Sequence, residues 1–470
     1  MVFEPAACGR SPSYHAAVNP SSVFADTARL PGRWAHDVRV SFADGAITAI
    51  EEGAVHQAQE QRVALLLPGM TNLHSHAFQR AMAGLTEVAS AGDDDFWSWR
   101  EWMYRFMARI GPEDAEAIAA QLYVENLKLG VTSLVEFHYL HNDIDGRPYA
   151  NRAEMALRIA AAARASGIAL TLAPVLYSYG GFGRAPLSPA QRRFGTTVDD
   201  VLQIIDALTP LAGNRLRIGI APHSLRAAEV AQIRALVNGA PVNAPLHIHA
   251  SEQTREVDEC LAASGKRPVR LLLDAVGLDA RWCVVHATHL TDDEVRDLAA
   301  SGAVAGLCPS TEADLGDGVF PFVEFAAARG RFGIGGDSHV CRSPFEELRL
   351  LEYSQRLSRR KRNLALHAPG VAIADALWEA ASAGGAQAAA RDAGVIAVGK
   401  RADLVALALA DPGAAAHASE LWLSLAVFGG SAPRVTDVWV TGEAVIRDGR
   451  HPQEGPVAAR FHQTIARLIA

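Results

Sequence analysis

Short apolar runs alternate with amphipathic stretches through the middle of the chain. The segments 113–129, 153–165 and 292–300 repeat their apolar residues at helical spacing. Alternating strands and helices are typical of a parallel sheet covered by helices, and eight such strands predict a (β/α)8 TIM barrel, an α/β fold. The expected strands are residues 64–73, 132–138, 168–176, 216–223, 245–249, 282–286, 303–308 and 332–337.

The two ends of the chain have a different pattern. Short stretches of alternating polar and apolar residues, separated by turn residues, occupy 23–50 and return in 402–445. We therefore expect a small discontinuous β-sandwich domain built by both termini. The predicted organisation is a loosely ordered N-terminal extension (1–20), the β-sandwich domain (21–63 and 395–455), the barrel (64–394) and a C-terminal helix (456–470).

Composition removes several classes of function. A net charge of −8 argues against nucleic acid as the main partner, and no apolar run approaches the length of a membrane span. The N-terminal residues lack the pattern of a secretory signal. The 5 cysteines are scattered and form no Cys-x-x-Cys pair, which argues against a disulfide framework and a structural zinc site. We expect a reducing cytoplasm as the compartment.

Histidines gather where the predicted strands end. His74 and His76 follow the first strand, and residues two apart in an extended segment point to the same side. Taken alone, such a pair is more often two polar loop histidines than a metal site. His247 and His249 share one face of the fifth strand, and His249 is the better candidate ligand because it lies nearer the carboxyl end.

Further polar residues follow the same rule. Glu252 lies just beyond the fifth strand, His286 ends the sixth and Asp337 ends the eighth, while His138 and His223 end two others. The carboxyl ends of barrel strands meet at one rim, where the active sites of such barrels lie. Imidazole and carboxylate groups on one rim predict a metal site with an open position for water.

These motifs resemble those of the amidohydrolase superfamily of metal-dependent hydrolases. Binuclear members of that superfamily use a carbamylated lysine, typically at the end of strand four. The lysines Lys128, Lys266, Lys361 and Lys400 all lie outside the predicted strands, so we expect a mononuclear site. The segments that carry the resemblance are 68–76, 247–252, 285–287 and 335–339.

Longer runs are similar to those of one family within it, the formimidoylglutamate deiminases. Ser310, Asp314 and Gly336 depart from that family's pattern, where Thr, Asn and Ser would be expected. The resemblance implies hydrolysis of N-formimino-L-glutamate, a step of histidine degradation, to N-formyl-L-glutamate and ammonia. The matching runs are 76–85, 96–104, 135–141, 175–183, 221–226 and 307–318.

The resemblance also implies roles for individual residues. One Zn²⁺ per subunit is expected, with Fe²⁺ or Mn²⁺ left open. Glu252 would be the general acid/base, assisted by His286 and Asp337. The expected metal ligands are His74, His76, His249 and Asp337. The expected substrate-binding residues are Gln79, Arg100, Tyr139, His223 and Arg226.

Two arginines distinguish this hypothesis from a deaminase of an aromatic ring. Arg100, expected on the loop after the first strand, and Arg226 suit the two carboxylates of a glutamate tail. The tryptophans at 97, 99 and 102, expected in the same loop, would exclude water. Alternatives are a deaminase of guanine or S-adenosylhomocysteine, an enzyme for N-formimino-L-aspartate, and an inactive metal-binding scaffold. A homodimer is implied by the resemblance alone.

Overall fold

The computed structural model describes residues 22–89, 92, 94–365, 370–408, 417–430 and 433–470. The predicted extension over 1–20 lies outside these residues. The helices are α1 (Phe96–Met107), α2 (Pro112–Lys128), α3 (Glu154–Ser166), α4 (Val198–Leu208), α5 (Val230–Gly239), α6 (Thr254–Ser264), α7 (Pro268–Ala275), α8 (Asp292–Ser301), α9 (Pro309–Asp314), α10 (Phe322–Ala327), α11 (Pro344–Arg359), α12 (Ile373–Ala388), α13 (Trp422–Phe428) and α14 (Glu454–Ile469).

Parallel strands in the middle of the chain form the predicted barrel. Its strands are β5 (Met70–Ser75), β6 (Val131–His138), β7 (Ala169–Leu176), β8 (Leu216–Ile218), β9 (Ala221–Pro222), β10 (Leu246–Ala250), β11 (Trp282–His286), β12 (Val304–Leu307) and β13 (Arg331–Ile334). They form two runs, β5 to β9 and β10 to β13. Parallel bridges between Ile220 and Leu246 and between Ser75 and Asp337 join the runs, so the sheet closes on itself. The fourth strand of the barrel is interrupted and forms β8 and β9, whereas the sequence predicts one continuous strand over 216–223.

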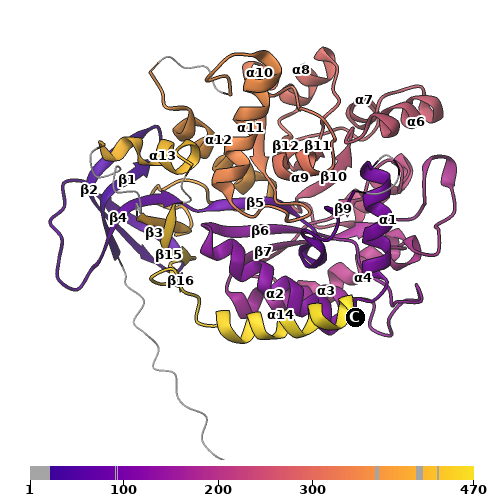
Figure 1. The fold of residues 1–470 in the computed structure, drawn as a ribbon, viewed down its shortest axis with the longest axis horizontal. Helices are drawn as coiled ribbons and strands as arrows, with labels where there is room; N and C mark the ends of the chain where they lie inside the picture. Colours follow the sequence, from indigo (N-terminus) through magenta and orange to yellow (C-terminus); the bar gives the residue numbers. More distant parts are fainter. Residues whose placement is uncertain (1–21, 90–91, 93, 366–369, 409–416, 431–432) are drawn as a thin grey trace, which may run out of the picture.

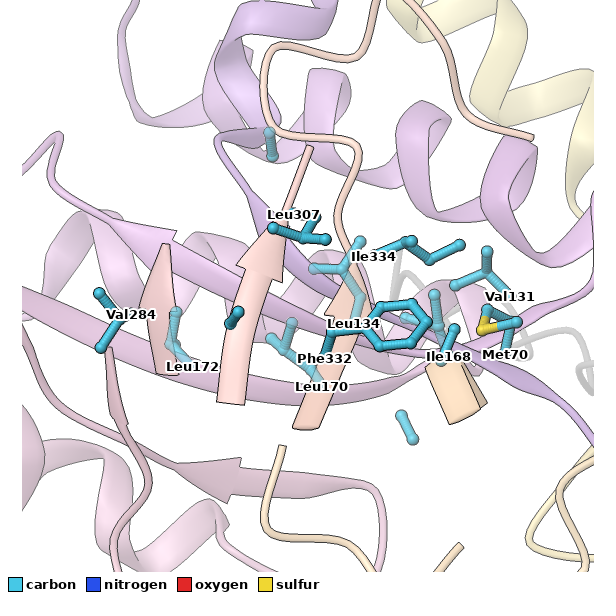
Figure 2. Close-up of a cluster of buried hydrophobic side chains, with 14 of the residues drawn as sticks. Met70, Val131, Leu134, Ile168, Leu170, Leu172, Val284, Leu307, Phe332 and Ile334 are labelled. Atoms are coloured by element: carbon cyan, nitrogen blue, oxygen red, sulfur yellow. The ribbon is translucent and has the colours of Figure 1, made fainter. Parts of the chain in front are cut away.

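Alternate residues of the barrel strands pack in opposite directions. Val284 belongs to the large cluster between strands and helices, whereas its neighbours Cys283 and Val285 pack with Leu73 in a small separate cluster. Figure 2 shows part of the large cluster, with labelled side chains from β5, β6, β7, β11, β12 and β13. Apart from Arg331 at the start of β13, the residues of these strands are buried on both faces, as expected for a parallel sheet covered by helices.

A separate sheet is formed by the two ends of the chain, as the sequence predicted. Its order is β16-β15-β14-β4-β1-β2-β3, so strands from the C-terminal region lie beside strands from the N-terminal region. Figure 1 shows this sheet at one end of the molecule and α1 at the other, with α14 lying along α2. Its strands are β1 (Ser22–Leu30), β2 (Arg33–Ala43), β3 (Ala46–Glu51), β4 (Gln61–Pro68), β14 (Leu404–Ala408), β15 (Arg434–Val440) and β16 (Glu443–Ile446).

The apolar run 64–73 corrects the sequence-based expectation of a single barrel strand. Its first part lies in β4, which pairs with β1 and β14 in the terminal sheet, and its second part lies in β5 of the barrel. The division falls at Gly69, where a Cβ atom would lie only 2.3 Å from the side chain of Thr132. Strand β6, which carries Thr132, approaches the chain so closely there that position 69 requires glycine.

Candidate active site

Three histidines from two strands meet at the carboxyl end of the barrel. The Nε2 atom of His74 lies 3.2 Å from Nε2 of His76 and 3.0 Å from Nε2 of His249. His74 and His76 lie at the end of β5 and just beyond it, and His249 lies near the end of β10. The side-by-side placement expected from the two-residue spacing of His74 and His76 is therefore observed.

A carboxylate completes this group of side chains. Asp337 follows β13, and its Oδ1 atom lies 3.3 Å from Nε2 of His76 and 3.5 Å from Nε2 of His74. Its other oxygen lies 3.8 Å from Nε2 of His286. Asp337 is held close to the histidines by the backbone, because its N–H donates to the carbonyl of His74 at 3.0 Å.

Backbone carbonyls set which ring nitrogens carry protons. Nδ1 of His76 donates to the carbonyl of Phe137 at 3.1 Å, and Nδ1 of His249 donates to the carbonyl of His223 at 3.0 Å. The Nε2 atoms of both rings therefore present lone pairs toward the group. Such outer contacts typically orient metal-binding histidines.

Burial keeps these imidazoles neutral. It lowers the pKa of His76 to about 3 and lowers the pKa values of His74 and His249 well below the ordinary value, with neighbouring histidines adding to the effect for all three. Burial also raises the pKa of the Asp337 carboxyl to about 7. Neutral imidazole is the form that binds a metal ion.

This donor set fits a divalent cation. Lone pairs of buried Nε2 atoms would repel one another at 3.0–3.2 Å unless a positive charge lay among them. Four ligands arranged tetrahedrally around zinc are separated by about 3.4 Å, close to the observed spacings. His74, His76 and His249 form one group of buried side chains that could hold such an ion, and Asp337, which groups with His74 and His286, lies 3.3 Å from His76.

The backbone is strained at the same strand ends. Among the residues with positive φ that are not glycine are His286 (64°) and Asp337 (45°), together with Ser251, Ala287 and His339 beside them. Side chains other than glycine pay a conformational cost in this region, and such residues cluster at functional sites. The strain at His286 and Asp337 aims two side chains into one pocket.

A second layer of side chains links acids to His286. Nε2 of His286 lies 3.7 Å from Glu252, and its Nδ1 lies 3.4 Å from Glu312. Burial opposes charging of this ring, but the carboxylates of Glu252, Glu312 and Asp337 outweigh it and raise the pKa of His286 to about 10. The charged ring therefore lies between the carboxylates of Glu252 and Glu312.

The pocket opens above this cluster. It is half-enclosed, and aromatic side chains form much of its wall. Gln79 donates to the hydroxyl of Tyr139 at 2.8 Å, so two of the expected substrate-binding residues hold each other in place. The residues that line the pocket are His76, Gln79, Phe96, Trp99, Arg100, Met103, Tyr104, Tyr139, Tyr177, Phe194, His223, Arg226, His249, Glu252, His286, Thr311, Leu315 and Asp337.

Two guanidinium groups face this pocket with unused donors. The Nε atoms of Arg100 and Arg226 are buried without a hydrogen-bond partner in the described part of the chain. Arg226 lies 3.8 Å from Glu252, and within the described residues Arg100 has no ion pair. The partner-free Nε donors of both groups, and the lack of an ion pair at Arg100, point to an anionic ligand.

Arg100 lies on a helix, which corrects the expectation of a loop. Asp95 caps the first turn of α1, accepting from the N–H groups of Trp97 and Ser98 at 2.9 Å each. Phe96, Met103, Tyr104 and Met107 then form a buried stripe at helical spacing. The tryptophans at 97, 99 and 102 are likewise helical, and of these Trp99 lines the pocket while Trp102 is 52% exposed.

In the described residues, neither His138 nor the less favoured candidate His247 belongs to the groups of side chains that could hold a metal ion. His247 is buried inside the barrel, with Nε2 donating to the carbonyl of Ala388 at 2.9 Å. His138 is buried beside His141, and it is its neighbour Phe137 whose ring lies 5.1 Å from that of His74. Neighbouring residues of a strand point to opposite faces, so only one of the pair can reach the site.

Some pocket residues had no individual expectation. Glu312 lies in the run 307–318 but in no local motif that predicts its role. Its contact with His286 joins α9 to the end of β11, and this depends on how the two elements pack. Tyr104 and Tyr177 line the pocket as well, and burial is the first cause that raises the pKa of Tyr104. Their signal was their position in two of the unusual runs, 96–104 and 175–183.

Comparison with known families agrees with this architecture. The model of the amidohydrolase family matches residues 65–445. A model described as the N-terminal domain of formimidoylglutamate deiminase HutF matches residues 21–64. Because the first match spans most of the sequence, the chain belongs to the amidohydrolase family.

Individual relatives narrow the comparison. A formimidoylglutamate deiminase of Pseudomonas aeruginosa is 50% identical, over 96% of this chain and 100% of that protein. A 5-methylthioadenosine/S-adenosylhomocysteine deaminase of Natronomonas pharaonis is 27% identical, over 92% and 94% of the two chains. The crystal structure of an amidohydrolase from Brucella melitensis is 45% identical with a TM-score of 0.90, covering 96% of this chain and 100% of that one.

Proposed function

We propose that the protein hydrolyses N-formimino-L-glutamate to N-formyl-L-glutamate and ammonia, a step of histidine degradation. The observation that carries the proposal is a single pocket with acids and histidines at its base and two guanidinium groups in its wall. The 50% identity to a formimidoylglutamate deiminase supports it. The substrate has a cationic formimino head and a tail with two carboxylates, which complement these two regions.

The proposed metal ligands are His74, His76, His249 and Asp337, and zinc is the proposed ion because it suits three imidazoles and one carboxylate. A bound divalent cation lowers the pKa of a water molecule toward neutrality. Elemental analysis of the purified protein tests both the identity of the ion and its proposed number, one per chain.

Proton transfers are assigned to Glu252. In the reaction the oxygen of water bonds to the formimino carbon, and the bond from that carbon to the terminal nitrogen breaks. Glu252 accepts a proton from the attacking water and donates it to the terminal nitrogen, which departs as ammonia. As the formyl C=O forms, the proton left on the oxygen passes to Glu252. His286 and Asp337 orient the water. Nε2 of His286 and Oδ2 of Asp337 lie 3.8 Å apart, close enough for both to contact one water molecule.

The tail is assigned to the wall of the pocket. Arg100 and Arg226 bind the two carboxylates, using donors that the described part of the protein leaves unused. Gln79, Tyr139 and His223 complete the proposed substrate contacts, since all three line the same pocket. The aromatic side chains around them limit access of bulk water, which strengthens these charged interactions.

Release of ammonia from N-formimino-L-glutamate tests the function, with guanine and S-adenosylhomocysteine as competitors for the ring-deaminase alternative. We expect turnover of the formimino compound alone; turnover of either purine compound without it would overturn the proposal. N-Formimino-L-aspartate is a further comparison, because one methylene changes binding by only about 1–3 kcal/mol.

The predicted assembly and compartment are parts of the proposal. We propose a homodimer, tested by light scattering, and a cytoplasmic location, tested by cell fractionation. In the described residues, the helices are all too short or too polar to span a membrane. The division into a terminal β domain (21–63 and 395–455), the barrel (64–394) and the helix at 456–470 is proposed likewise, and limited proteolysis tests it.

A further inference from the structure

One indole lies among three arginine side chains beside the pocket. The guanidinium carbons of Arg100 and Arg255 each lie 4.4 Å from the centre of the Trp97 ring, and that of Arg226 lies 6.0 Å away. In the described residues, the pocket wall includes Trp99 but not Trp97. Trp97 therefore contacts groups proposed to bind substrate without lining the pocket itself.

The charges around this indole are unevenly matched. Arg255 is 61% exposed and pairs with Glu259 at 2.7 Å, and Arg226 lies 3.8 Å from Glu252. Arg100 has no ion pair within the described residues, although its Nε is buried. Aromatic rings hold it instead, Trp97 at 4.4 Å and Tyr104 at 5.5 Å.

The way in which Arg100 is held bears on what it can bind. A ring contacts the flat face of a guanidinium group, whereas the N–H donors radiate in its plane. A carboxylate partner would occupy those donors, but an aromatic partner leaves them available. The backbone of Trp97 is held at the helix start, because its N–H donates to the capping side chain of Asp95 at 2.9 Å, and its indole packs against the ring of Phe96 at 5.0 Å.

We propose that Trp97 is a positioning residue for substrate recognition: its indole holds Arg100 by the face and sets where that guanidinium meets one carboxylate of the substrate. This inference rests on the proposed function, in which Arg100 binds a carboxylate. Trp97 thereby favours ligands with two carboxylates over ligands with one.

Steady-state kinetics of Trp97→Leu and Trp97→Phe test the proposal. Loss of the cation–π contact should raise KM for N-formimino-L-glutamate about tenfold and leave kcat within about twofold, with a smaller rise for Trp97→Phe, which keeps an aromatic face. The chain offers a matched control: Trp102 on the same helix covers Arg105 at 5.6 Å, outside the pocket. Trp102→Leu should leave KM unchanged.

A double-mutant cycle shows whether Trp97 acts through Arg100. In an Arg100→Met background, Trp97→Leu should add no further rise in KM. An equal rise in both backgrounds, or an unchanged KM in Trp97→Leu, would overturn the proposal. If Trp97→Leu does not fold, the same comparison is made between Trp97→Phe and Trp102→Phe.

Binding without turnover separates this inference from the proposed function. Calorimetry with glutarate, a dicarboxylate, and butyrate, a monocarboxylate, measures recognition of the tail alone. We expect the wild type to prefer glutarate and Trp97→Leu to lose most of that preference; an unchanged preference would refute the inference. Absence of turnover in a wild type that binds glutarate would refute only the proposed reaction.

Discussion

The base and the wall of the pocket are built in different ways. At the base, His76 and His249 come from strand ends and are fixed by hydrogen bonds to backbone carbonyls. In the wall, Arg100 comes from a helix and is held by ring faces. Fixed geometry suits groups that must converge on an ion, whereas partners that leave donors free suit groups that bind substrate. We therefore assign the reaction to the base of the pocket and recognition of the substrate tail to its wall.

Removal of the proposed metal ion should have the largest effect, because every function of the base depends on it. Dialysis against a chelator should abolish ammonia release, and added zinc should restore it. The melting temperature should fall as well, since an ion that binds only the folded chain stabilises it. Full activity in protein shown by elemental analysis to be free of metal would contradict the assignment of the base.

Glu252→Gln should have the next largest effect. The amide keeps the shape of the side chain but cannot carry the proton, so kcat should fall about 1000-fold while KM and metal content stay nearly constant. Glu259→Gln on α6 is the control, because that acid pairs with Arg255 outside the pocket. Retained activity in Glu252→Gln would move the proton transfer to another group, such as His286.

Substitution of the wall arginines should affect binding instead. Arg100→Met or Arg226→Met removes a charged partner of one carboxylate, so KM should rise about 100-fold with a smaller change in kcat. Arg105→Met tests the loss of an arginine from the same helix outside this pocket. A fall in kcat without a rise in KM would show that the wall takes part in the reaction, and the contrast between the two regions would fail.

The base of the pocket could be predicted from the sequence because its geometry is local. Two histidines at i and i+2 of a strand must share a face, and the ends of barrel strands must share a rim. This placed His74, His76, His249, His286 and Asp337 together. The terminal sheet followed similarly from strand-like patterns at both ends of the chain.

The wall could be predicted only in part, because its contacts join distant segments. Helix α1 carries large aromatic residues that face both the core and the pocket, which obscures its helical period. The contact of Glu312 with His286 depends on how α9 sits against β11. Likewise, the need for glycine at position 69, where the run divides, comes from the approach of Thr132 on β6, a tertiary contact that an apolar run does not reveal.

Glu312→Gln should have the smallest effect of these changes and tests how far the rigid base extends. Glu312 also accepts from the N–H of Cys308 at 2.9 Å, so it joins His286 to the start of α9. Glutamine can still accept a hydrogen bond from the His286 ring. The substitution nevertheless removes one of the carboxylates that favour the charged form of His286. We expect kcat to fall about tenfold, typical of a group that orients a catalytic side chain, with KM and metal content unchanged.

Glu347→Gln is the matched control, because this buried acid accepts from the N–H of Ser310 on α9 and, within the described residues, forms no ion pair with His286. An equal loss in both variants would show that kcat depends on the packing of α9 and not on the partner of His286. A rise in KM in Glu312→Gln alone would instead mean that the base also positions the tail. Either result would weaken the separation between base and wall. A fall in kcat confined to Glu312→Gln would show that the reaction depends on Glu312, the acid behind His286, as well as on the proposed metal ligands.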